Sequence, residues 1–244
     1  MQSSNCLNCG TPVDRKFCPE CGQKTDTHRI TPQHFIMHDL VHGVMHLDKG
    51  ILFTLKETFI RPGYAARDYV AGRRKNYYNI FYLIFLLLGI YMVAQGHDAM
   101  AIQIDSNPAT QGLPTFFANF YKFVFLYAKY LVLVIIPILA LSGFIVFQKL
   151  NYNYAEHQII SGFVMLGSII LILAAMLIEA ISQKASVLIS IFSPLLFAVL
   201  VYYQATKNKY SLLGYIWRMI PFFVLSLVWS TLFMLMLVVL VFKL

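Results

Sequence analysis

Long apolar runs alternate with short polar or basic stretches along most of this chain. Each of these runs is close to the ~20 residues that an α-helix needs to cross a hydrocarbon core of about 30 Å. The fourth run is the least regular, because it is short and contains Ser190, Ser193 and Pro194. The pattern predicts an all-α integral membrane protein of about five spans, at residues 78–95, 123–147, 159–178, 187–203 and 219–242.

The segment before the first span has helical periodicity rather than a continuous apolar run. From Thr31-Pro32 onward, apolar residues gather on one arc of a helix. A second segment, Ile51 to Ile60, ends at Arg61-Pro62-Gly63, and a basic stretch then leads into the first span. Neither segment is long enough to span, so we predict two amphipathic helices at the cytoplasmic membrane interface.

The N-terminal segment contains two Cys-x-x-Cys-Gly motifs, formed by Cys6 with Cys9 and by Cys18 with Cys21. In each motif two sulfurs of one tight turn reach the same ion, and the glycine permits the required backbone conformation. Four thiolates complete a tetrahedron and leave no position for water or substrate. We therefore predict one structural zinc ion per chain in a four-cysteine zinc ribbon.

These features divide the chain into three parts. Residues 1–24 are the ribbon, residues 25–76 hold the interfacial helices and the basic juxtamembrane segment, and residues 77–244 form the membrane domain. The first thirty residues are polar and lack the apolar core of a secretory signal, so we expect the ribbon to stay in the cytosol, where thiols remain reduced.

Charge supports this organisation. Only 12% of the residues are charged, whereas soluble domains carry about 25%. Eleven of the nineteen Lys and Arg residues lie between Arg15 and Lys75. Five spans with a cytoplasmic N-terminus and an outer C-terminus keep most later cations inside as well, which the positive-inside rule favours. The cations retained inside by the fourth span are Lys207, Lys209 and Arg218.

The basic excess in a membrane protein points to anionic lipid rather than to nucleic acid. The cations expected to contact headgroups are Arg61, Arg67, Arg73, Arg74 and Lys75. A cytosolic protein partner and a homo-oligomer both remain open.

Three blocks carry a family resemblance. They are the ribbon ending Phe17-Cys-Pro-Glu-Cys-Gly-Gln23, the stretch from Asp48 through Arg61-Pro-Gly63 to Lys75, and Tyr154-Ala-Glu-His157. On these blocks the chain resembles an uncharacterised family of bacterial inner-membrane proteins with an N-terminal zinc ribbon, the domain of unknown function 3667. Ile80 stands where that family often has proline. The resemblance implies a membrane location and supplies no activity.

Two polar groupings have a functional and a plain interpretation. His34, His38, His42 and His46 share one helix face. They can form a second metal site or a pH-sensitive cluster, or simply the polar face of an interfacial helix. Glu156 and His157, at the head of the third span, can relay protons or bind an ion, whereas the plain interpretation is that Glu156 caps a helix.

The sequence contains no catalytic motif for a serine hydrolase, a phosphate loop, a dinucleotide site or a His-Glu-x-x-His metalloprotease. We therefore expect a non-enzymatic membrane protein that uses its ribbon as a docking or scaffold module. The alternatives are a small transporter, channel or lipid-handling protein, and a membrane enzyme acting at the inner headgroup level.

Overall fold

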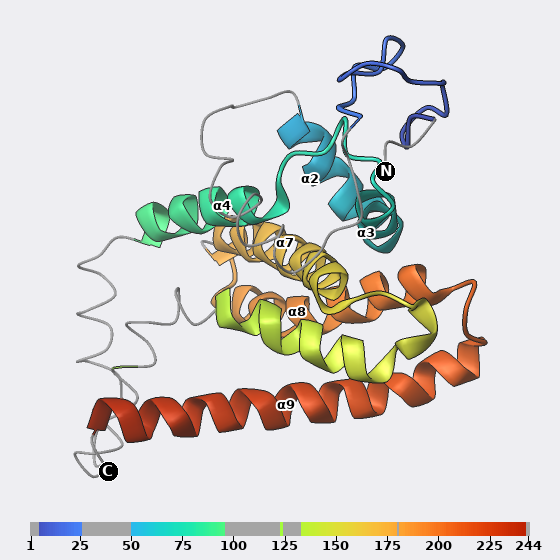
Figure 1. Cartoon of the computed structure of the whole chain (residues 1–244). Coiled ribbons are helices and arrows are strands. Elements are labelled where there is room, and N and C mark those ends of the chain that lie inside the picture. The colour runs from blue at the N-terminus through green and yellow to red at the C-terminus, as the bar shows by residue number, and fades with distance from the viewer. Residues whose placement is uncertain (1–4, 26–49, 96–122, 124–132, 180, 243–244) are drawn as a thin grey trace, which may run out of the picture.

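The computed structural model describes residues 5–25, 50–95, 123, 133–179 and 181–242 (Figure 1). Over these ranges the regular structure is helical, apart from isolated antiparallel bridges at Asn5–Pro12 and Phe17–Lys24. The helices are α2 (Gly50–Ile60), α3 (Pro62–Val70), α4 (Ile80–Gln95), the unlabelled helix Leu133–Val146, the short 3-10 helix η3 (Gln148–Leu150), α7 (Tyr154–Glu179), α8 (Gln183–Thr206) and α9 (Leu212–Phe242).

Three of these helices are long and apolar enough to cross a membrane. They are α7, α8 and, within α9, Leu212–Leu240. Two shorter apolar helices, Ile80–Ala94 and Leu133–Val146, lie where the first two spans are predicted. The all-helical prediction is thus confirmed for the described residues, while the number of five spans stays a prediction.

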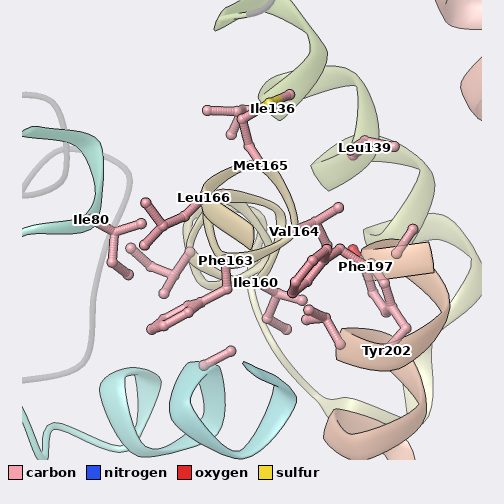
Figure 2. Packing of buried hydrophobic residues seen from close by; sticks show 14 of the residues in the cluster. Ile80, Ile136, Leu139, Ile160, Phe163, Val164, Met165, Leu166, Phe197 and Tyr202 are labelled. Atoms are coloured by element: carbon pink, nitrogen blue, oxygen red, sulfur yellow. The ribbon is translucent and has the colours of Figure 1, made fainter. Parts of the chain in front are cut away.

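Helix α7 occupies the centre of the structure (Figure 1). Every residue from Ala155 to Ile169 is buried, and α7 packs against α3, α4 and α8. Figure 2 shows α7 between Ile80 of α4, Ile136 and Leu139 of the neighbouring helix, and Tyr202 of α8. The buried part of α7 has no outer polar face, which agrees with the lack of an amphipathic pattern in its sequence, and its polar residues are buried as well.

Small residues set how closely these helices approach. A Cβ added at Gly167 would lie 2.2 Å from the Phe197 ring, and one at Gly63 would lie 2.3 Å from the Val201 carbonyl oxygen. Close approach at small residues gives membrane helices the van der Waals contact that apolar burial cannot supply in lipid. Glycine is therefore needed where α7 meets α8 and where α3 meets α8.

Helix α3 corrects the prediction of a simple break at Arg61-Pro62-Gly63. Helix α2 ends at Ile60, but the chain resumes a helix at Pro62, where proline needs no backbone N–H partner. Ala65 and Ala66 are fully buried against the core. The sequence does not indicate this helix, because it is short and polar and its stability depends on packing against α7 and α8.

Helix α2 lies where the second interfacial helix is predicted, and its polar residues face the protein. Glu57 and Thr58 are buried, whereas Leu52 and Phe59 are exposed. Thr54 links α2 to the next segment, because its hydroxyl accepts a hydrogen bond from the Tyr78 amide at 2.8 Å. Helix α2 therefore holds these polar residues against the bundle and presents Leu52 and Phe59 outward.

Two loops meet at the end of the bundle where α3 packs. The Lys149 amide donates a hydrogen bond to the Tyr210 hydroxyl at 3.0 Å. The Lys149 ammonium and the Arg218 guanidinium lie 5.5 Å and 4.3 Å from the centroid of the Tyr210 ring. Gly63 of α3 donates to the Gln204 side chain of α8 at 2.9 Å, close to these loops. Basic residues from distant parts of the sequence therefore share one end of the helices.

The glycine contact between α7 and α8 gives a direct test. Gly167→Ala places a methyl group against the buried Phe197 ring, so we expect a loss of about 1–3 kcal/mol of stability from overpacking. The same substitution at Gly89, which has open space around it, should be neutral or stabilising by up to about 1 kcal/mol because alanine favours helix. Thermal unfolding of the purified protein in one detergent measures both, and equal midpoints would contradict the packing.

Candidate metal centre and buried polar cluster

The two Cys-x-x-Cys-Gly motifs, here called knuckles, bring the predicted ligands together. The sulfurs of Cys6, Cys9, Cys18 and Cys21 all lie within 4.8 Å of one another. Cys6 lies 3.6 Å from Cys21, and Cys9 lies 3.5 Å from Cys18. A tetrahedral ion with metal–sulfur bonds of about 2.3 Å requires sulfur separations of about 3.8 Å. The four thiols therefore fit one metal ion.

The two knuckles have the same backbone. The amides of Gly10 and Gly22 each donate, at 2.8 Å, to the carbonyl of the first cysteine of their knuckle, Cys6 or Cys18. Both glycines have positive φ angles, +79° and +70°, which residues with a side chain rarely adopt. The glycine of each motif is thus required by the turn that positions the sulfurs.

Cys9 lies in surroundings that favour the thiolate. Its sulfur lies 3.3 Å from the Thr11 hydroxyl. Hydrogen bonding from the side chain and backbone of Thr11 lowers the pKa of Cys9 to about 6. Because the thiolate is the form that binds metals, this contact favours ligation.

The ribbon is fastened to the loop between α3 and α4. Gln23 is only 5% exposed, and its side-chain nitrogen donates to the Gly72 carbonyl at 3.0 Å. The Lys75 ammonium donates to the Gly22 carbonyl at 3.4 Å. The second knuckle therefore contacts the juxtamembrane segment directly and is not held only by the connecting chain.

Several of the cations predicted to meet headgroups already have protein partners. Arg61 forms ion pairs with Glu57 and Asp68, and Arg73 also pairs with Asp68. Burial alone lowers the pKa of Arg61, but the two carboxylates raise it overall above its ordinary value.

The remaining two arginines make aromatic contacts. Arg74 donates to the Tyr69 carbonyl at 3.0 Å and lies over its ring, and Arg67 lies 6.0 Å from the Tyr64 ring. Headgroup binding by these five cations stays a prediction.

Glu156 caps α7. Its carboxylate accepts a hydrogen bond from the Asn153 amide at 2.7 Å, and the Asn153 side chain accepts one from the Glu156 amide at 2.9 Å. This reciprocal pair is a capping box, and it starts α7 at Tyr154, five residues before the predicted span. Glu156 and His157 therefore both lie in the first turn of a buried helix, and the capping interpretation describes what Glu156 does.

His157 has a different environment. It is fully buried, and its ring lies edge-on to Phe144 and Tyr152 at 6.1 Å and is stacked with Tyr202 at 6.4 Å. The sequence places Ser161 one helical turn after His157, but no pattern indicates that Tyr202 of α8 joins them. His34, His38, His42 and His46 lie outside the described residues.

Comparison with known proteins adds a family match over part of the chain. A family described as "Protein of unknown function (DUF3667)" matches residues 48–92, which include α2, α3 and most of α4. No curated protein and no solved structure matches the chain. The match agrees with the second of the three sequence blocks, whereas the ribbon and α7 to α9 lie outside it.

The two interpretations of Glu156 predict different effects of its substitution on stability. Glu156→Ala removes the Glu156 half of the capping box and should cost about 1 kcal/mol, while Glu156→Gln retains an acceptor at the same position and should cost much less. Glu179→Ala, at the exposed far end of α7, is the matched control. Thermal unfolding of the three variants tests this, and a Gln variant as unstable as the Ala variant would show that the charge itself is required.

Proposed function

We propose that this chain is a non-enzymatic bacterial inner-membrane protein whose zinc ribbon is a rigid docking module for a cytosolic protein. The proposal rests on the hydrogen bonds by which Gln23 and Lys75 fasten the ribbon to the α3–α4 loop. A ribbon that served only as a folded end of the chain would not need this contact. Fastening it holds one surface at a fixed position above the membrane, which lowers the entropy lost when a partner binds.

Zinc is the proposed ion because of its ligand set. Four cysteine sulfurs in a tetrahedral arrangement are typical of structural zinc, and they leave no position for substrate. The ion holds the two knuckles together, since neither has a hydrophobic core of its own. Its role is to fix the ribbon surface and not to catalyse a reaction.

The proposed docking surface lies on the two knuckles. Leu7 is 40% exposed and Phe17 is 57% exposed, and each is adjacent to a cysteine ligand. Gln23 is buried toward the α3–α4 loop. The metal therefore positions an exposed leucine and phenylalanine that are suited to an apolar contact, while another side of the ribbon is used for attachment.

The proposed orientation in the membrane is based on the positions of basic residues. Lys149 and Arg218 meet at the end of the bundle where α3 packs. Retention of basic residues on the cytoplasmic side supports an N-terminus inside and a C-terminus outside. In this orientation Leu52 and Phe59 of α2 lie against the inner leaflet, and Arg67 is placed to contact anionic headgroups.

Crosslinking in living cells tests the docking role. A photoreactive phenylalanine analogue at position 17 should give a discrete adduct with one cytosolic protein. The adduct should disappear in the Cys18→Ser variant, because the surface around residue 17 depends on the metal. The purified parent chain should carry one zinc ion, measured by elemental analysis.

Two controls separate docking from chance contact. The same analogue at Leu52, which faces lipid in this proposal, should not capture that protein. The identified partner should also bind the purified full chain in detergent, with at least tenfold weaker binding for Phe17→Ala. An adduct that is unaffected by Cys18→Ser, or binding unaffected by Phe17→Ala, would contradict the proposal.

A further inference from the structure

Three buried polar side chains at the start of α7 and the end of α8 lack hydrogen bonds. His157, Ser161 and Tyr202 are all 0% exposed. Both ring nitrogens of His157, the Ser161 hydroxyl and the Tyr202 hydroxyl have no hydrogen-bond partner in the described part of the chain. Most buried polar groups in proteins are paired, and an unpaired group destabilises the fold. Four such atoms in one place therefore require an explanation.

These atoms lie close to one another. Ser161 lies one helical turn after His157, so both project from the same side of α7. The Tyr202 ring is stacked on His157, with an interplanar angle of 20°. The Ser161 and Tyr202 hydroxyls interact without reaching hydrogen-bond geometry. The cluster therefore joins α7 to α8 through groups that do not bond one another directly.

Gly143 closes the cluster from the third helix, Leu133–Val146. A Cβ added there would lie 2.1 Å from the Tyr202 hydroxyl and 2.9 Å from Nδ1 of His157. These two polar atoms are thus at most the sum of those distances apart, about 5 Å. Neither atom has a hydrogen-bond partner in the described residues, and two unpaired groups within this limit are close enough for one water molecule to bridge them. Glycine at 143 lets both polar groups approach the third helix.

We propose that His157, Ser161 and Tyr202 bind one buried water molecule between α7, α8 and the helix Leu133–Val146. A buried water makes about three hydrogen bonds to groups that are otherwise unpaired, and this cluster supplies that number of side chains. A metal ion is a poor alternative, because the cluster has one imidazole and no cysteine or carboxylate.

The sign of a stability change distinguishes a hydrated from a dry cluster. Tyr202→Phe removes one hydroxyl from the full-length protein. If that hydroxyl binds water, the unfolding midpoint falls by several degrees. If the cluster is dry, removing an unpaired hydroxyl leaves the midpoint unchanged or raises it. Tyr215→Phe is the matched control, because the Tyr215 hydroxyl donates to the Val199 carbonyl at 2.6 Å and its loss lowers the midpoint in either case.

A second measurement detects the water itself. In bilayers containing full-length protein with labelled histidine, solid-state NMR should transfer magnetisation from water to the His157 ring, assigned by its loss in His157→Phe. The transfer should weaken severalfold in Tyr202→Phe. No transfer to the ring in the parent protein would overturn the proposal, including when Tyr202→Phe is destabilising, because a direct bond between His157 and Tyr202 would then explain the stability change. An unchanged or raised midpoint for Tyr202→Phe would also overturn it.

Discussion

The burial of the first half of α7 is the packing on which the rest of this structure depends. From Ala155 to Ile169 this helix has neighbours on every side. Within lipid, apolar side chains gain little by facing one another rather than the hydrocarbon, so association relies on close and well-fitted contact. Gly167 against Phe197 and Gly63 against the backbone of α8 supply that contact. Helix α9, by contrast, joins the hydrophobic core only near its start, through Tyr215, Met219 and Phe222.

The position of α7 also determines where the polar parts of the molecule gather. Its capped start at Asn153 lies beside the loops that carry Lys149 and Tyr210. Helix α3 packs against the same region, and the ribbon is fastened to the loop that follows α3. The candidate metal site is far from α7 in sequence. It is connected to the core because the ribbon contacts the α3–α4 loop and α3 packs against α7. These contacts support a docking role for the ribbon, because a partner bound to it would be held at a fixed position relative to the packed helices.

The sequence predicts the parts of the structure that hydropathy and metal chemistry alone decide. Apolar runs locate α7, α8 and α9, and the Cys-x-x-Cys-Gly motifs identify the four sulfurs that meet. Two features depend on packing between distant segments and could not be predicted. Helix α3 is stabilised by contact with α7 and α8, and Tyr202 reaches His157 only because α8 returns beside α7. The start of α7 is different, because it depends on a local cap at Glu156 that the sequence suggests and hydropathy ignores.

We propose that the ribbon, α3 and the segments that carry Lys149 and Tyr210 share the cytoplasmic end of the bundle. Labelling of intact cells with a membrane-impermeant maleimide tests it most directly, using Lys207→Cys in the loop after α8 and Lys184→Cys at the opposite end of that helix. We expect residue 184 to be labelled in intact cells, whereas residue 207 should be labelled only after the inner membrane is opened. Labelling of residue 207 in intact cells, with residue 184 protected, would contradict it.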